Sequence, residues 1–134
     1  MQYRFLTLEE FVPYASQVLT LVEKALVYSS DDWDLADAMQ QYTNGTSVLF
    51  VVLDENAQHV VSCAMGSFVH YPKHTVFFCS LAAGSFEASH LDRFAELVKC
   101  AGAKYIEATV RPSVARLLRR RGFFSRHMVV RRAL

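Results

Sequence analysis

Apolar and polar positions alternate along the 134-residue chain in a way that predicts a mixture of helices and strands. Residues 3–6 can form a short strand, and residues 7–26 then carry apolar side chains at helical spacing. Thr7 and Glu10 have the spacing of a capping box, in which each side chain satisfies the other's backbone N–H. Pro13 favours a helix that starts late, with the proline in its first turn.

A second helix is predicted after this segment. Ser30 can serve as its N-cap, and Asp31, Asp32 and Asp34 near its start suit the positive end of the helix dipole. We expect this helix to run to about Tyr42 and to stop at Asn44-Gly45, which is a typical turn pair.

The hydrophobic period then changes to that of strands. Residues 47–53, 59–69 and 75–81 are rich in β-branched and aromatic residues and are separated by short polar turns, which predicts an antiparallel meander. The runs are apolar on both faces, so we expect helices to cover both sides of the sheet. Gly66 lies inside the second run and predicts a bulge or a close backbone approach.

The last third returns to alternating helices and strands. It predicts a helix that begins near Ser89 and ends at Gly102, and then a strand over 104–110. A helix over 113–121, ended by Gly122, and a final strand or strand pair over 123–131 follow. Phe123 and Phe124, at the start of this last strand, are expected to face the core. The full order is β-α-α-β-β-β-α-β-α-β. We predict one domain over residues 1–134, of the α/β class with a mixed sheet and about four helices.

This order, together with the stretch RPSVARLLRRRGFF at residues 111–124, resembles the GCN5-related N-acetyltransferase (GNAT) superfamily. Members of that family often carry a short helix after the fifth strand that ends in Gly-Phe, as Gly122-Phe123 does here. The resemblance covers nearly the whole chain and implies an acyl-CoA donor, acetyl-CoA or CoA itself, and an amine acceptor. The acids in the first two helices hint at a basic or amine acceptor.

The resemblance also implies where the donor binds. In the family, backbone N–H groups after the fourth strand, together with the next helix N-terminus, cradle the pyrophosphate. The corresponding positions here are Leu81, Ala83, Gly84 and Ser85, and the arginines Arg111 and Arg116 are candidates for contacts to CoA. The loop has one glycine and no basic residue, and its acid Glu87 is interpreted as starting or capping the following helix.

Glu107 is the candidate general base by its place on the strand before the short helix. The competing interpretation is a half-exposed strand residue paired with a nearby arginine. Many family members have a tyrosine in the short helix that protonates the leaving thiolate, and Leu118 occupies that position here. No metal site is predicted, because Pro72 between His70 and His74 argues against a helical pair of ligands.

Charge is distributed unevenly along the chain. All 13 acids and six basic residues lie in residues 1–107, whereas residues 108–134 contain eight arginines and no acid. The basic end could bind phosphates of a nucleic acid. This interpretation ranks low, because the stretch lacks interleaved exposed aromatics and no helix-turn-helix precedes it.

The remaining composition points to a protein of the cytoplasm. The apolar runs are too short to cross a membrane, the start has no signal-peptide core, and Cys63, Cys79 and Cys100 are interpreted as buried thiols. Three functions stay open. They are an acyl-CoA-dependent N-acyltransferase, a non-catalytic GNAT-like protein of bacteriophage type that binds a protein partner, and a nucleic-acid-binding protein.

Overall fold

A computed structural model describes residues 1–28 and 32–134. The elements are β1 (Gln2–Leu6), α1 (Leu8–Phe11), a 3-10 turn η1 (Val12–Tyr14), α2 (Ala15–Leu26), α3 (Leu35–Thr43), β2 (Val48–Leu53), β3 (Val60–His70), β4 (Thr75–Gly84), α4 (Ala88–Cys100), β5 (Tyr105–Ala108) and α5 (Pro112–Arg119).

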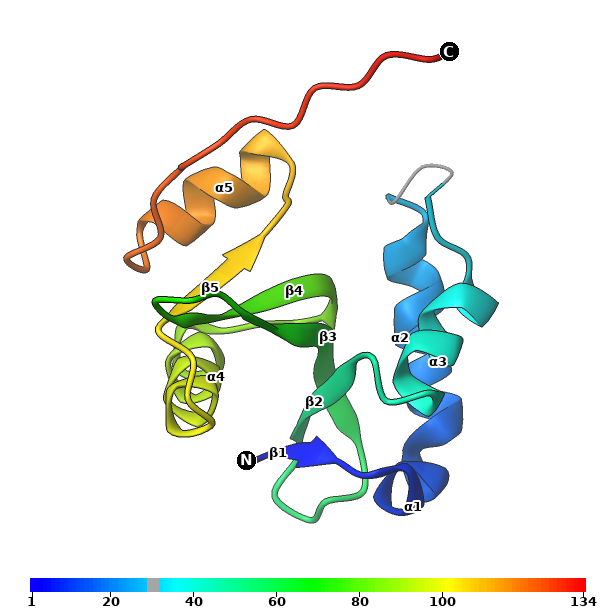
Figure 1. The fold of residues 1–134 in the computed structure, drawn as a ribbon. Coiled ribbons are helices and arrows are strands. Elements are labelled where there is room, and N and C mark those ends of the chain that lie inside the picture. The colour runs from blue at the N-terminus through cyan, green and yellow to red at the C-terminus, as the bar shows by residue number, and fades with distance from the viewer. Residues whose placement is uncertain (29–31) are drawn as a thin grey trace.

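The strands form one mixed sheet in the order β1-β2-β3-β4-β5 (Figure 1). The first four are antiparallel neighbours, and β5 runs parallel to β4. The predicted meander is therefore confirmed, as is the mixed sheet. The parallel pair follows from the α4 crossover, which brings the chain back to the same end of the sheet before β5 begins.

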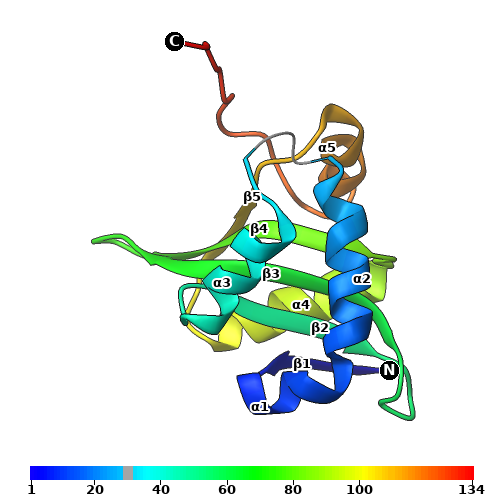
Figure 2. The same cartoon turned by 90° about the vertical axis from the view of Figure 1, so that its right-hand side faces the viewer.

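Helices cover both faces of the sheet, as the apolar strands predicted. Figures 1 and 2 show α2 and α3 on one face and α4 on the other. Successive residues of β2 point to opposite faces. Leu49 and Val51 join the core beneath α2 and α3, whereas Phe50 and Val52 join the core beneath α4. All four side chains are almost completely buried.

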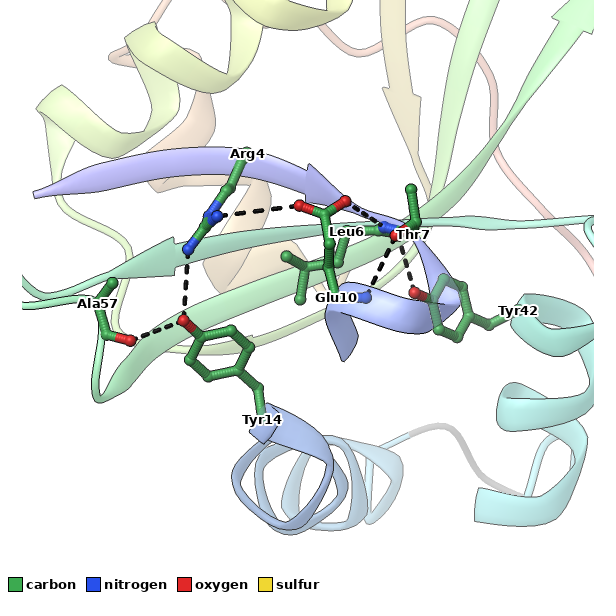
Figure 3. Close-up of polar contacts among 7 residues, drawn as sticks. All are labelled: Arg4, Leu6, Thr7, Glu10, Tyr14, Tyr42 and Ala57. Atoms are coloured by element: carbon green, nitrogen blue, oxygen red, sulfur yellow. Dashed lines mark hydrogen bonds and ion pairs between the residues drawn. The ribbon is translucent and has the colours of Figure 1, made fainter. Parts of the chain in front are cut away.

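The first helical segment is divided at its proline. The Thr7–Glu10 capping box is present, with N–H to oxygen distances of 3.2 Å and 3.1 Å (Figure 3). The predicted late start fits the long helix α2, which begins at Ala15 after the proline, but the prediction missed α1. Helix α1 starts at Leu8, directly after the cap, and Pro13 lies in the 3-10 turn that joins it to α2. The capping box stabilises a helical turn ahead of the proline, which the late start did not allow for.

The N-terminal segment is held against the sheet by tyrosine hydroxyls. Tyr42 of α3 donates to the carbonyl oxygen of Leu6 at 2.9 Å, and Tyr14 donates to the carbonyl oxygen of Ala57 at 2.7 Å (Figure 3). Arg4 of β1 donates to the Tyr14 hydroxyl at 3.3 Å. These bonds link helices to strands and so fix the position of α2 and α3 over the sheet.

The second helix has a different cap from the predicted one. Asp34 is the N-cap of α3: its carboxylate accepts from the N–H of Asp37 at 2.8 Å, and its own N–H donates to the Asp37 carboxylate at 3.1 Å. Helix α3 therefore begins later than expected. The predicted cap Ser30 and its neighbour Asp31 lie outside the described residues.

Gly66 marks the predicted irregularity in the sheet. Met65 pairs with Leu81 whereas Gly66 pairs with Cys79, so Ser80 is an extra residue on β4. A Cβ atom on Gly66 would lie 2.4 Å from the carbonyl oxygen of Phe78 and 2.6 Å from the Phe77 ring. Both predicted features, the bulge and the close approach, are present at this point, although the inserted residue belongs to the neighbouring strand.

The C-terminal segment, residues 123–134, corrects two predictions. It forms no strand in the described structure, and Phe124 is exposed instead of facing the core. Arginines anchor the segment elsewhere: Arg126 approaches Glu107 at 3.7 Å, and Arg131 pairs with Asp32 at 2.7 Å. These arginines flank the short Met-Val-Val run, and their partners lie on β5 and before α3.

The three cysteines differ in their surroundings. Cys63 is buried and Cys79 is half-buried, but Cys100 is exposed at the end of α4. The expectation of three buried thiols was therefore wrong for Cys100, which lies on the solvent side of an amphipathic helix whose buried side carries Phe94 and Val98.

Candidate functional site

The two parallel strands separate in the middle of the molecule. Strands β4 and β5 pair from Val76–Tyr105 to Cys79–Ala108. Strand β5 ends at Ala108, whereas β4 continues to Gly84. The last part of β4 thus has no partner on the β5 side, and a cavity lies on each side of this separation.

The first cavity, called here the α3 cavity, lies between the α2–α3 layer and strands β3 and β4. Its volume is about 170 Å³, and its lining consists of Leu26, Trp33, Ala38, Gln41, Ser47, Met65, Ser67, Phe78, Ser80 and Leu81. Ala38, Ser47 and Met65 are buried and form the floor. Trp33 and Phe78 are 42% and 36% exposed, which places them at the mouth.

The second cavity, called here the α5 cavity, lies between the start of α4 and helix α5. Its volume is about 210 Å³, and its lining consists of Phe86, Ala88, Leu91, Leu117, Leu118, Arg120 and Arg121. One wall is the first turn of α4, where the N–H of His90 bonds the carbonyl oxygen of Glu87 at 3.1 Å and the N–H groups of Ala88 and Ser89 have no intrahelical acceptor. The opposite wall includes Arg120 and Arg121, so groups that can bind an anion border the cavity on both sides.

The loop predicted to cradle a pyrophosphate is engaged with β3. Ala83 and Gly84 pair with residues of β3, and the N–H of Ser85 donates to the carbonyl oxygen of Val61 at 3.3 Å. Gly84 has a φ of +89°, and a Cβ there would lie 2.5 Å from the same oxygen. The glycine is thus required by strand packing. Leu81, the first predicted loop residue, lines the α3 cavity instead.

A buried histidine fixes the start of α4. Glu87 occupies the N-cap position, as favoured from the sequence, and its N–H donates to Nδ1 of His90 at 3.1 Å. His90 is almost completely buried and packs near the Tyr3 ring. Because Nδ1 accepts, the ring is neutral with its proton on Nε2. His90 had no visible partner in the sequence, since its contacts come from a cap and from a distant strand.

The predicted arginines lie outside the α5 cavity. Arg111 is the N-cap residue of α5, and its guanidinium lies 4.1 Å from the centre of the Tyr28 ring, a cation–π contact. Arg116 is exposed. The cavity is lined instead by Arg120 and Arg121, which sequence reasoning missed. Arg120 is the C-cap of α5 and Arg121 follows it, so both lie where the chain leaves the helix beside Leu117 and Leu118. The signal that could have found them is the basic run directly before the helix stop at Gly122.

Glu107 lies beside the α3 cavity. It pairs in register with Phe78, so both side chains point to the face of the sheet that α2 and α3 cover. Its carboxylate is partly exposed and lies 3.7 Å from the guanidinium of Arg126. The arginine partner foreseen in the alternative interpretation is therefore present, and the residue also stands next to a cavity mouth.

Cys79 lies at the last paired position before the strands separate. Its Sγ donates to the carbonyl oxygen of Leu81 at 3.4 Å, and burial raises the pKa of its thiol to about 11. At neutral pH the group is an uncharged thiol. It is therefore neither a nucleophile nor a useful acid toward a leaving thiolate of lower pKa.

Among residues 1–28 and 32–134, no group of three or more His, Cys, Asp or Glu side chains could hold a metal ion. No helix in this part of the chain is long and apolar enough to span a membrane.

Comparison with known proteins shows the fold. No protein-family model matches the sequence, and no curated protein sequence matches it.

Among solved structures, one described as "a probable acetyltransferase" has a TM-score of 0.73 at 11% identity, and the match covers 100% of this chain and 97% of that chain. A GNAT family acetyltransferase from Staphylococcus aureus has a TM-score of 0.69 at 14% identity, covering 99% of this chain and 98% of its own. An aminoglycoside acetyltransferase from an uncultured soil sample has a TM-score of 0.69 at 14% identity, covering 99% and 94%. The chain therefore has the fold of the GNAT acetyltransferases.

Proposed function

We propose that this protein is an acyl-CoA-dependent N-acyltransferase. The observation that carries the proposal is the separation of β4 from β5 with a cavity on each side. An acyl transfer between two substrates needs a place for each, with the reacting atoms meeting between them. The α5 cavity suits the donor and the α3 cavity suits the acceptor.

The α5 cavity fits the chemistry of an acyl-CoA. Phe86, Leu91 and Leu117 offer apolar surface to a pantetheine arm or a base, and Arg120 and Arg121 offer guanidinium groups to phosphates. The first turn of α4 adds the positive end of a 13-residue helix. Arginine side chains directly after α5 thus take the place of the family's basic, glycine-rich loop. In this chain the Ser85 N–H of the corresponding loop is already bonded to β3.

Glu107 is the group best placed to accept the proton of the attacking amine. The amine nitrogen attacks the thioester carbonyl, a C–N bond forms, the C–S bond breaks, and the nitrogen loses one proton. Glu107 is the carboxylate of β5, on the same face as Phe78 at the mouth of the α3 cavity. Its ion pair with Arg126 orients the carboxylate.

The thiolate that leaves takes its proton from water in this proposal. Leu118 lines the α5 cavity where family members often have a tyrosine, and it has no proton to donate. The Cys79 thiol, with a pKa of about 11, is a weaker acid than the thiol that would be formed. Positioning of the two substrates, with one general base, then supplies the catalysis.

Calorimetric titration with acetyl-CoA tests the donor site. We expect saturable binding, and much weaker binding of S-acetylpantetheine, which lacks the phosphates that Arg120 and Arg121 would meet. Mass spectrometry of a reaction with acetyl-CoA and benzylamine then detects N-acetylbenzylamine. Absence of heat at millimolar acetyl-CoA would refute the proposal at its first step.

A second candidate function is protein binding through residues 123–134. The observation that favours it is the exposure of consecutive apolar side chains, with Met128 and Val130 89% and 87% exposed. Such a strip normally marks a contact surface. Comparison of the proteins captured by the intact chain and by a Val129→Glu/Val130→Glu variant tests this candidate. Identical capture by both counts against it, whatever the result with acetyl-CoA.

A further inference from the structure

The size of the α3 cavity limits what can occupy it. A cavity of about 150 Å³ lined by apolar side chains holds one benzene ring. The α3 cavity, at about 170 Å³, therefore accepts a single ring or a short branched apolar group. Pockets for larger ligands usually start near 300 Å³. A sugar antibiotic or an extended chain would leave most of its body outside.

Among residues 1–28 and 32–134, those that line the α3 cavity carry no charge. Its floor is Ala38, Ser47 and Met65, and its mouth is Trp33, Phe78 and Ser80. The nearby acids are used elsewhere: Asp34 and Asp37 cap α3 through each other's backbone, and Asp32 pairs with Arg131. A charged group on the floor would lose hydration without gaining an opposite charge. The acidic helices that hinted at a basic acceptor therefore do not line this cavity.

Among the described residues, the carboxylate that can meet a ligand lies near the mouth. Phe78 lies on the mouth and is the register partner of Glu107 on the adjacent strand, so the Glu107 carboxylate stands one strand away on the same face. Its ion pair with Arg126 is 3.7 Å long, looser than the hydrogen-bonded 2.7 Å pair of Asp32 with Arg131, so Glu107 can turn to a ligand. A ligand with an apolar body and one terminal ammonium can then place the body on the floor and the ammonium toward Glu107. A ligand with a second charge on its body cannot.

We propose that the α3 cavity binds a small primary amine whose single positive charge is joined by a short linker to one ring or one compact apolar group. As an acceptor for acyl transfer, such an amine rests on the function proposed above. The proposal that such an amine binds as a ligand rests only on the volume, the neutral lining and the mouth of the cavity. The nitrogen lies at the mouth, at the separation of β4 and β5, and the apolar body lies inside.

The protein contains its own reporter for this site, because its single tryptophan is Trp33 at the mouth. Fluorescence titration without acyl-CoA compares benzylamine, benzyl alcohol and 1,4-diaminobutane. We expect saturable changes with the first two. Benzylamine should bind about two- to fivefold more tightly, as one partly exposed ion pair allows. The diamine should give no saturable change. Glu107→Gln should remove the advantage of benzylamine and leave benzyl alcohol unaffected.

Variants of α3 test the location. Ala38→Leu fills the floor and should weaken benzylamine at least about tenfold. Ala36→Leu, two residues away on the exposed side of the same helix, adds the same side chain outside the cavity and should change nothing. If Ala38→Leu does not fold, Ser80→Leu narrows the mouth at an exposed position and should give the same loss.

Failure of this proposal is distinguishable from failure of the acyltransferase proposal. Tight binding of 1,4-diaminobutane, equal binding by Ala38→Leu and Ala36→Leu, or no saturable change with benzylamine or benzyl alcohol would overturn the ligand class while leaving acetyl-CoA binding intact. Saturable benzylamine binding without any acetyl-CoA binding would uphold the cavity's ligand and overturn only its role as an acceptor.

Discussion

The carbonyl oxygen of Phe78 lies where a side chain on Gly66 would begin, 2.4 Å from the position of its Cβ atom. We predict that Gly66→Ala destabilises the protein by about 3 kcal/mol, the upper part of the range for overpacking, because both the oxygen and the Phe77 ring must move. Urea unfolding monitored by circular dichroism measures the difference in the free energy of unfolding between this variant and the unmodified protein. Gly45→Ala is the control. It has a positive φ of 83° but nothing within 4 Å, so its cost is only the backbone strain of about 1 kcal/mol.

The hydroxyl of Tyr42 bonds the carbonyl oxygen of Leu6 inside the core beneath α3. Tyr42→Phe should cost about 1–2 kcal/mol, because the acceptor remains buried without this donor. Tyr71→Phe, at an exposed turn position, should cost nothing measurable in the same urea experiment. Equal midpoints for the two variants would contradict the structural role of this bond.

Alkaline pH should weaken the fold through the same residue. Burial raises the pKa of Tyr42 to about 12, above its ordinary value of 10.0. Between these values the unfolded chain loses a proton that the folded chain keeps, so stability is intact below pH 10 and falls as pH rises toward 12. Cys63, whose thiol pKa burial raises to about 12 from 9.0, adds a decline that begins near pH 9. Urea midpoints from pH 8 to 11.5 should fall less steeply in Tyr42→Phe.

The three thiols should react with a thiol reagent at different rates. Cys100 is exposed and should react with Ellman's reagent at the rate of a free thiol, whereas Cys63 is buried and should react only after unfolding. Native protein should therefore show one fast thiol, and Cys100→Ser should abolish it. Fast modification of the Cys100→Ser variant would mean that the half-buried Cys79 is accessible, or that the strands around Cys63 open more readily than their packing implies.

Glu107 should affect turnover more than donor binding. If it is the general base, Glu107→Gln lowers kcat by about 100-fold, while the affinity for acetyl-CoA measured by calorimetry stays unchanged. Arg126→Ala separates this role from that of the ion pair, because it removes the partner at 3.7 Å and leaves the carboxylate in place. Similar losses in both variants would point to the ion pair as the required feature.

The arginines of α5 should contribute unequally to donor affinity. Arg120→Ala and Arg121→Ala each remove a guanidinium from the lining of the α5 cavity and should weaken acetyl-CoA by about tenfold or more, as loss of a charge-assisted hydrogen bond does. Arg116→Ala, within α5 and outside the lining of the cavity, should have little effect. The opposite ranking would favour the CoA contact predicted for Arg116 from the sequence.

Much of the fold could be predicted because local signals agreed with the packing. The runs of β2, β3 and β4 are β-branched and aromatic, and Gly102 and Gly122 both have the positive φ that a residue after a helix end requires. The prediction of a last strand over 123–131 was wrong because the local signal there disagreed with the long-range contacts. Val129 and Val130 favour a strand locally, but the neighbouring Arg131 finds Asp32, which is remote in sequence.

The candidate site was only partly predictable. Glu107 and the donor loop could be placed by element order, but the engagement of Ser85 with Val61 depends on strand register, which no local pattern encodes. His90 and the α3 cavity likewise arise from contacts between distant segments. Asp34 and Asp37 of the second helix cap α3, and composition alone does not distinguish a carboxylate that caps a helix from one that binds a ligand.

The absence of a strand beyond β5 in the described structure leaves one side of the sheet open to solvent. Strand β5 is an edge of only four residues, with Lys104 directly before it and Glu107 within it. Short, charged edges discourage unwanted strand addition between molecules. Neutralising Lys104 and Glu107 would therefore favour edge-to-edge pairing between molecules.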